Sequence, residues 1–246
     1  WKIKKNVRNN YNIILNNSVD ENGDLYCINQ VELLINKIGN NNCNFITADG
    51  GFDFSSNYNN QEKNFMNLFI SEIYIILNLL KLGGNGLIKI YDIYSKNSIK
   101  VLYILSLFFE KIFITKPYTS RPANSEKYIL CYRFSKNDNY YFYLNILKNI
   151  IITKNLELLN NNNIVIPYQF LYKIFIYNKW YTERQINYIN KTIDYIEQFK
   201  NLNQEENNSS IINNKNNNKN DIEFFNDMYD INKKVCINWC KKYNII

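Results

Sequence analysis

A regular alternation of short apolar runs and longer helical segments between residues 44 and 115 constrains the fold more than any other feature of the chain. The apolar runs NFITA, GLIKIYD and KIFIT have the length of buried strands. Between them lie two segments, 62–82 and 95–111, with helical character. This order of strands and helices is typical of right-handed crossovers in a mostly parallel sheet, so the sequence predicts an α/β fold.

Two further elements extend the alternation on either side. The stretch QVELLINKI (30–38) has helical spacing and is followed by Gly39, a favourable residue just after a helix end. The apolar run YILCYRF (128–134) follows the third strand through a loop rather than a helix. We therefore expect residues 128–134 to pair antiparallel, at or near the edge of the sheet.

The pattern changes after residue 140, where helical segments replace the alternation. This change predicts an α/β domain over residues 1–140 and a helical extension over 141–246. Within the extension, residues 204–221 are of low complexity and cannot bury a core, so we expect a disordered insertion there. A last helix is expected over 221–246.

Charge and composition favour an anionic partner without identifying one. The 246 residues carry a formal net charge of +7, which suits binding to RNA. Asn, Ile, Lys, Tyr and Phe are all over-used, however, as in proteins from AT-rich genomes. Part of the lysine excess therefore follows from composition, and charge alone does not locate a binding face.

The absence of histidine excludes several kinds of site. A chain with no histidine has no Ser-His or Cys-His nucleophile, so proton chemistry must use Lys, Asp, Glu or Tyr. An odd number of scattered cysteines argues against a disulfide framework and for a reducing compartment, and we expect no metal site. The five cysteines are Cys27, Cys43, Cys131, Cys236 and Cys240.

Neither a membrane span nor a signal peptide is expected. No run of 18 or more apolar residues occurs, and the first ten residues, WKIKKNVRNN, contain no apolar core of a signal sequence. Because Trp1 is not an initiator residue, we expect the sequence to be a piece of a longer protein.

Charged residues follow the predicted strands at the edge of the sheet where ligands bind in open α/β folds. Asp49 ends the first strand, Lys89 lies within the second, and Glu126 lies in the loop after the third. A lysine inside an apolar strand is costly unless it is paired, so a cluster of these three residues could hold an amine that takes or steers a proton. The alternative is a structural ion pair of Lys89 with Asp92 or Glu72.

Glycines occur near two of these strands. The run GGNG (83–86) lies between a predicted helix and the following strand, so we interpret it as a helix cap and turn rather than a phosphate loop. Gly50 and Gly51 do follow a strand, but they lack the spacing of a cofactor fingerprint.

The loop KPYTSRPANSEKY (116–128) is too long for a simple hairpin turn. It is basic, contains prolines and separates two apolar runs. Such a loop is typical of a segment retained for its side chains, among them Lys116, Arg121, Asn124, Ser125 and Glu126.

Three stretches together resemble the FtsJ-like (RrmJ-type) cap-specific mRNA 2'-O-methyltransferases, and most closely the eukaryotic enzyme that methylates the first transcribed nucleotide. They are FITADGGFD (45–53), GG-x-GLIKIYD (83–92) and KPYTSRPANSEKYILC (116–131). Weaker similarity begins at NGDLYCINQVELL (22–34) and continues to the tail WCKKYNII. The resemblance implies a methyltransferase with a Rossmann-like sheet and with S-adenosyl-L-methionine as its cofactor.

The resemblance also implies roles for individual residues. Asp49, Lys89 and Glu126 match the aspartate, the second lysine and the glutamate of a Lys-Asp-Lys-Glu tetrad. The resemblance implies that Lys89 orients the ribose 2'-oxygen and helps to deprotonate it. Asp24 and Asp49 match acids near the cofactor. Contacts to the capped RNA and its phosphates are implied for Asn124, Ser125, Lys116 and Arg121.

Two parts of the family pattern have no match in residues 1–44: the glycine-rich cofactor loop and the first lysine of the tetrad. We therefore expect the sheet to be incomplete at its N-terminus. The expected partner is the capped 5' end of mRNA, with transcription or capping machinery as a further possibility, and the expected location is the nucleus, with the cytoplasm as the alternative. Ribosomal RNA methylation and a non-catalytic RNA-binding or partner-binding module remain as alternatives.

Overall fold

The structure is a computed structural model that describes residues 24–51, 60–117, 120–161 and 164–208, together with residues 233, 234, 237, 238 and 241. The chain divides into two compact units, which are described separately. The first comprises Trp1–Thr115 and Lys127–Phe175, and the second comprises Lys116–Glu126 and Ile176–Ile246.

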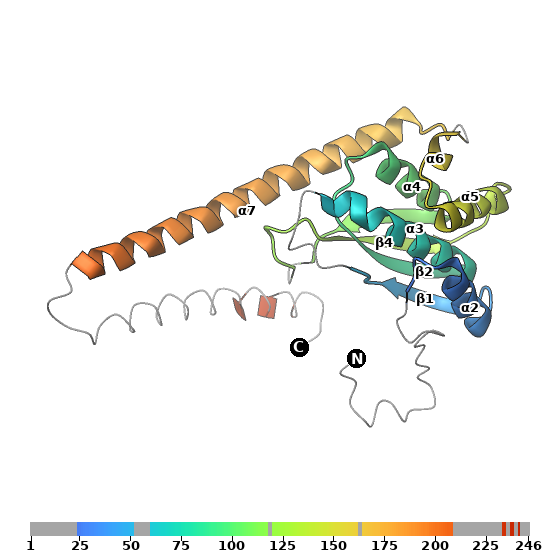
Figure 1. The fold of residues 1–246 in the computed structure, drawn as a ribbon, viewed down its shortest axis with the longest axis horizontal. Coiled ribbons are helices and arrows are strands. Elements are labelled where there is room, and N and C mark those ends of the chain that lie inside the picture. Colours follow the sequence, from blue (N-terminus) through green and yellow to red (C-terminus); the bar gives the residue numbers. More distant parts are fainter. Residues whose placement is uncertain are drawn as a thin grey trace, which may run out of the picture. The chain divides into compact units, whose positions relative to one another are not determined.

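The first unit is built on a four-stranded sheet with the order β1-β2-β4-β3 (Figure 1). Its strands are β1 (Cys43–Ala48), β2 (Leu80–Ile90), β3 (Phe109–Thr115) and β4 (Lys127–Phe134). β1 and β2 pair in parallel, whereas β4 is antiparallel to both β2 and β3. The α/β fold and the antiparallel last strand are confirmed. Because β4 lies between β2 and β3, only one pairing is parallel, and the sheet is mixed rather than mostly parallel.

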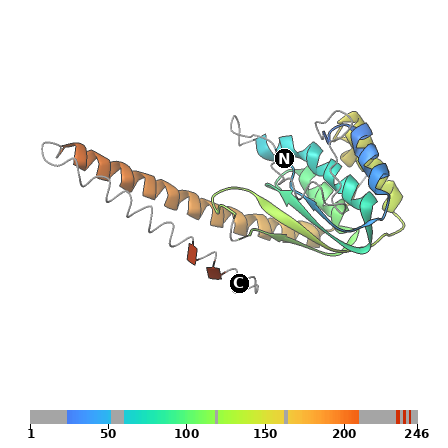
Figure 2. The same ribbon diagram turned by 90° about the horizontal axis from the view of Figure 1, so that it is seen from below.

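Helices cover one face of this sheet (Figure 2). The helices of this unit are α2 (Ile28–Ile38), α3 (Gln61–Leu79), α4 (Lys96–Ser106), α5 (Tyr140–Thr153) and the short α6 (Leu158–Asn161). α3 contacts β1, β2, α2, α4 and α5, and it is buried along most of its length. Alternate residues of β4 show the two faces, since Ile129 and Cys131 are buried while Leu130 and Tyr132 are exposed. Because α3 contacts both parallel strands and three of the other helices, it is the central helix of the core.

The glycine-rich run at 83–86 lies inside β2 rather than in a turn before it, so that sequence-based interpretation is wrong. β2 begins directly after α3, and the register between β1 and β2 shifts near the start of the pairing. A Cβ on Gly84 would lie 2.9 Å from the Lys81 carbonyl oxygen and 3.0 Å from that of Asn44, and Gly83 has a φ of 78°. The glycines thus allow the irregularity in the strand.

Among the described strands β1 lies at the edge of the sheet, and its side chains are half-buried or exposed there rather than buried as predicted. Its only neighbour among the described strands is β2, and the side chain of Phe45 is 56% exposed. The end of α2 and the start of α4 agree with the prediction, whereas α3 and α4 end at Leu79 and Ser106, before the predicted 82 and 111, because β2 and β3 begin at Leu80 and Phe109. α2 ends before Gly39, which has a φ of 88°, and α4 starts after Ser95, whose hydroxyl accepts the Ser98 N–H.

The helical segment after residue 140 belongs in part to the first unit. α5 packs on α3, and the Tyr140 hydroxyl donates to the Leu77 carbonyl at 2.7 Å. The ring of Tyr140 also packs edge-on against Phe108, which has no exposed surface. The predicted domain boundary at residue 140 remains a prediction.

α7 (Tyr168–Asn208) is the longest helix. It contains the first residues of the predicted disordered insertion, because Gln and Glu at 204–206 favour a helix and no Gly or Pro interrupts it. Residues 209–221 lie outside the described residues. So does most of the predicted last helix, of which residues 233, 234, 237, 238 and 241 are described and helical.

Candidate active site

An ion pair joins two of the predicted site residues at the carboxyl ends of the two parallel strands. Asp49 directly follows β1, and Lys89 is the last residue but one of β2. The Lys89 Nζ lies 2.7 Å from Asp49 Oδ1 and donates to the Asp49 carbonyl oxygen at 3.1 Å. The lysine side chain is 12% exposed and the aspartate side chain is 69% exposed. The amine is thus held in place beside a carboxylate that solvent can reach.

The alternative partners that the sequence offered for Lys89 are engaged elsewhere. Asp92 forms an ion pair with Lys127 at 2.9 Å. Glu72 accepts a hydrogen bond from the Gly50 N–H at 3.0 Å. Asp49 is therefore a carboxylate bound to the Lys89 amine, while the predicted cluster of these two residues with Glu126 stays a prediction.

Gly50 and Gly51 allow the turn after Asp49 to approach the core closely. A Cβ on Gly50 would lie 2.5 Å from Glu72 Oε1 and 2.7 Å from Leu68 Cδ2, closer than real Cβ atoms come. A Cβ on Gly51 would lie 3.2 Å from the Lys89 amine. Close packing thus explains Gly50, whereas at Gly51 a side chain would require only a small shift of the lysine amine.

Glu72 is a buried acid in the middle of α3, and its contact with the turn after Asp49 was not predicted from the sequence. Its relative exposure is 3%, and burial raises the pKa of its carboxyl to about 7, although the Gly50 N–H and the charge of Lys89 act in the opposite direction. The available signal was one acid within an otherwise apolar stretch, LFISEIYIIL. Such a residue is uncommon in a core unless it has a specific partner.

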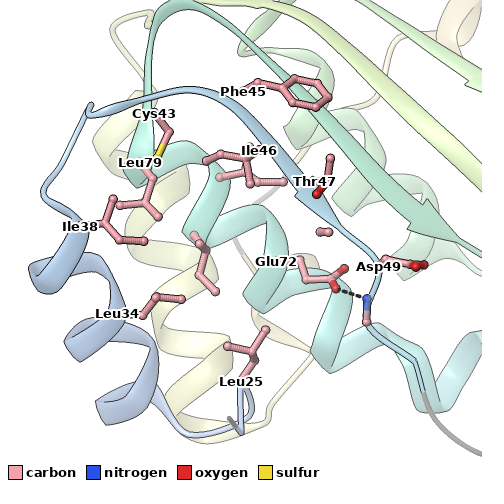
Figure 3. A pocket seen from close by; sticks show the side chains of 14 residues that line it. Leu25, Leu34, Ile38, Cys43, Phe45, Ile46, Thr47, Asp49, Glu72 and Leu79 are labelled. Atoms are coloured by element: carbon pink, nitrogen blue, oxygen red, sulfur yellow. Dashed lines mark hydrogen bonds between the residues drawn. The ribbon is translucent and has the colours of Figure 1, made fainter. Parts of the chain in front are cut away.

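A cavity of about 710 Å³ lies beside this ion pair, between α2, β1 and α3 (Figure 3). Its walls are mainly apolar, and Asp49, Gly50 and Glu72 supply polar groups. The apolar residues that line it are Leu25, Leu34, Ile38, Phe45, Ile46, Ala48, Ile75, Ile76 and Leu79. A cavity of this size with few polar groups has the character of a small-molecule site.

Asp24, the other predicted cofactor residue, lies at the start of the described chain. Its Oδ1 accepts the Tyr26 N–H at 2.8 Å, which fixes the turn that leads into α2. Leu25, between these two residues, lines the cavity. Burial, with the charges of Asp24 and Glu72, raises the pKa of Tyr26 to about 12. A contact of Asp24 with the cofactor stays a prediction.

In the second unit, Lys116 holds the loop 116–126 together. Its Nζ donates to Asn124 Oδ1 at 2.6 Å, to the Asn124 carbonyl at 3.0 Å and to the Glu126 carbonyl at 2.7 Å. The Ser120 hydroxyl donates to Glu126 Oε1 at 3.1 Å. Gln185 of α7 donates to the Ala123 carbonyl at 3.1 Å. The described residues of the loop are therefore held by its own polar groups and by α7.

These contacts bear on the predicted RNA-binding residues. Lys116 and Asn124 bind each other, Ser125 is buried, and Arg121 is exposed. Glu126 belongs to the second unit, so its action together with Asp49 and Lys89 stays a prediction. The contacts of all four residues with RNA also stay predictions.

Comparison with known proteins gives one family and several named relatives. The profile of the FtsJ-like methyltransferase family matches residues 3–134. A protein of Autographa californica nuclear polyhedrosis virus, described as a cap-specific mRNA (nucleoside-2'-O-)-methyltransferase, is 36% identical over 129 residues, 52% of this chain and 49% of its own. Cap-specific mRNA (nucleoside-2'-O-)-methyltransferase 2 of Drosophila melanogaster is 37% identical over 92 residues, 37% of this chain and 13% of its own. Cap-specific mRNA (nucleoside-2'-O-)-methyltransferase 1 of Danio rerio is 39% identical over 87 residues, 35% of this chain and 10% of its own.

The chain thus spans about half the length of the viral relative and much less of the animal ones. Among solved structures, a chain described as "Alphavirus P23pro-zbd" has a TM-score of 0.35 and 16% identity over 50% of this chain and 18% of its own, which is too low to support an argument. The family match covers more than half of the sequence and includes both Asp49 and Lys89. The chain therefore belongs to the FtsJ-like methyltransferase family.

Proposed function

We propose that the protein methylates the ribose 2'-hydroxyl of the first transcribed nucleotide of capped mRNA, with S-adenosyl-L-methionine as the methyl donor. The observation that carries this proposal is the Asp49–Lys89 ion pair at the ends of two parallel strands. It lies within the region that matches the FtsJ-like family. The named relatives are described as cap-specific mRNA 2'-O-methyltransferases, which favours the cap over ribosomal RNA.

Lys89 is the residue that would act on the hydroxyl. A ribose hydroxyl is a weak nucleophile until its proton is held or removed, and the chain has no histidine to do so. The Lys89 amine is fixed at 2.7 Å from the Asp49 carboxylate and can orient the 2'-oxygen. The proton of the 2'-hydroxyl can then pass to this lysine–aspartate pair. The residues that align the 2'-oxygen with the methyl carbon would supply much of the rate, since the sulfonium would release its methyl group and leave as a neutral thioether.

The described residues fit S-adenosyl-L-methionine in their chemistry. The cofactor would supply a methyl group carried on a positively charged sulfonium. Asp49 offers an exposed carboxylate to a cationic ligand, and the apolar cavity walls suit an adenine ring. Asp24, next to the cavity residue Leu25, is the second acid proposed to bind the cofactor.

The loop 116–126 is the proposed contact with RNA. Arg121 is exposed and suits a phosphate, whereas Lys116, Asn124 and Ser125 would keep the loop in shape and reach the capped nucleotide from it. Glu126 is proposed as the glutamate of the catalytic tetrad. Transcription or capping machinery is a proposed partner, and the nucleus is the proposed location, with the cytoplasm as the alternative. No helix in the described parts of the chain is long and apolar enough to cross a membrane, and the same residues contain no group of three metal-binding side chains.

Methyl transfer from radiolabelled S-adenosyl-L-methionine to short RNAs tests the proposal. The substrates are a capped RNA, the same RNA without the cap, and the capped RNA already 2'-O-methylated at its first nucleotide. We expect label in the first RNA alone. Label in all three would contradict cap specificity, and the absence of label together with no binding of the cofactor would favour a non-catalytic RNA-binding module.

A further inference from the structure

α3 places one acid, Glu72, against the turn that carries Asp49. Glu72 is 3% exposed and sits among apolar neighbours on a helix that is buried on several sides. Its Oε1 accepts the Gly50 N–H at 3.0 Å, while its Oε2 has no hydrogen-bond partner among the described residues. A buried acid with one unpaired oxygen is costly, because burial disfavours its charge and Oε2 gains no hydrogen bond among the described residues in return. Stability alone therefore does not explain why residue 72 is an acid.

We propose that Glu72 is a positioning residue, which fixes the Asp49–Gly51 turn and through it the position of Asp49 against Lys89. This inference rests on the proposed methyl transfer, because it assigns a residue to the same site. Glu72 itself touches neither of the two groups proposed to act on the hydroxyl. It acts through the backbone of Gly50.

The contacts form a short chain from the core to the ion pair. Glu72 Oε1 holds the amide of Gly50, and Leu68 packs on the same glycine from α3. The preceding residue, Asp49, contributes both its carbonyl and its carboxylate to the Lys89 amine. A shift of the Gly50 amide would therefore change these two contacts of the amine at once.

This geometry explains why an acceptor, rather than a charge, is needed at residue 72. The amide of Gly50 points at the buried Glu72 carboxyl in a partly buried hydrogen bond, so loss of the acceptor would leave this N–H without its partner. A glutamine carbonyl can accept this hydrogen bond in place of Oε1, whereas leucine cannot. Misplacement of a catalytic group by about 1 Å can cost about 10²-fold in rate.

Two substitutions in the full chain test the inference, Glu72→Gln and Glu72→Leu. We expect Glu72→Gln to keep kcat within about 3-fold of the wild type, and Glu72→Leu to lower kcat on capped RNA by about 10²-fold with little change in KM. Glu32→Gln is the matched control, because Glu32 accepts from the Tyr74 hydroxyl and pairs with Lys148 without touching the turn. Thermal unfolding checks that each variant is folded.

Hydrogen exchange of the Gly50 amide gives a second measurement that does not need activity. We expect protection in the wild type, in Glu72→Gln and in Glu32→Gln, and faster exchange in Glu72→Leu. A folded Glu72→Leu variant with full activity and a protected Gly50 amide would overturn the inference, as would a Glu72→Gln variant as defective as Glu72→Leu. An inactive wild type would count against the proposed methyl transfer, while the exchange data would still decide whether Glu72 holds the turn.

Discussion

Two lysine–aspartate pairs lie on neighbouring strands of the sheet and differ in their surroundings. Lys89 of β2 pairs with Asp49 at 2.7 Å, and Lys127 of β4 pairs with Asp92 at 2.9 Å. The side chains of the first pair are 12% and 69% exposed, whereas those of the second are 6% and 31% exposed. Of the two, the first pair therefore combines a held amine with a carboxylate that a substrate can reach.

The register of the sheet explains the difference. Lys127 lies opposite Ile90, which is buried, whereas Lys89 lies opposite Tyr128. Because successive residues of a strand point to opposite faces, the two lysines lie on opposite sides of the sheet. Lys127 faces the buried side, where a charge needs its partner for stability. A lysine within a strand thus becomes informative about function only when the exposure of its partner is known.

The largest expected effect is on activity, from Lys89→Ala. We expect kcat/KM for methyl transfer to capped RNA to fall by about 10²- to 10⁴-fold, because the amine that orients the hydroxyl and forms half of the proton-accepting pair is lost. The free energy of unfolding should change by less than about 1 kcal/mol, since water can solvate the exposed Asp49 carboxylate. Steady-state kinetics and urea unfolding measure the two quantities. Retained activity would remove the distinction between the two pairs.

The matching change in the second pair, Lys127→Ala, should act on stability instead. It leaves Asp92 partly buried without its cation, which we expect to lower the free energy of unfolding by about 2–3 kcal/mol. The folded fraction should keep its kcat. Urea unfolding measures the stability, and assays without denaturant, at a temperature well below the transition, measure kcat. A folded Lys127→Ala variant without activity would show that the second pair also serves the reaction.

Sequence patterns predicted the parts of this site that depend on the succession of strands and helices along the chain. The strand that ends at Asp49 and the strand that contains Lys89 both follow from short apolar runs, and their parallel pairing follows from the helix between them. Parallel neighbours bring their carboxyl ends to the same edge of the sheet, so the amino-acid pattern alone was enough to predict that Asp49 and Lys89 lie close together.

Contacts between distant residues could not be predicted in the same way. Glu72 and Gly50 are 22 residues apart, and Lys127 and Asp92 are 35 apart. Whether a charge inside an apolar run is paired, and with which residue, depends on strand order and register. β4 takes its place between β2 and β3, and this brings Lys127 to Asp92, which no local pattern indicates. The glycines inside β2 were misinterpreted for the same reason, since the Asn44 carbonyl that crowds Gly84 belongs to another strand.

A further effect, on the pH dependence of the free energy of unfolding, is expected from Glu72, which lies next to the first pair. The pKa of Glu72 is raised by burial to about 7 from 4.5, so the folded state binds this proton more tightly than the unfolded chain between these pH values. The free energy of unfolding should therefore fall as pH rises from about 4.5 to about 7, by up to about 3 kcal/mol from this residue. Asp49, Lys89 and Tyr26 are the titratable groups whose charges interact with it.

Glu72→Gln removes this titration, so the variant should gain stability relative to the wild type as pH rises through that window. Urea unfolding at a series of pH values between about 4 and 8 measures the difference, with Glu32→Gln as control because hydrogen bonding to Lys148 lowers the pKa of Glu32. Parallel stability curves for the wild type and Glu72→Gln would contradict a raised pKa.

The smallest effect is expected at a third ion pair of the same sheet, Glu110 with Arg133, whose side chains are 47% and 60% exposed at a separation of 3.3 Å. Glu110→Gln should change the free energy of unfolding by less than about 0.5 kcal/mol, because both charges are already solvated. Urea unfolding at low and high salt measures this, and methyl transfer should be unaltered. The three ion pairs then form a series. Loss of one charge lowers the free energy of unfolding only at the Lys127 pair, where the remaining charge is partly buried. Loss of one charge lowers the activity only at the Lys89 pair, where a fixed amine lies beside an exposed acid. A stability loss at Glu110 as large as that at Lys127 would break the series, since burial would no longer explain the order.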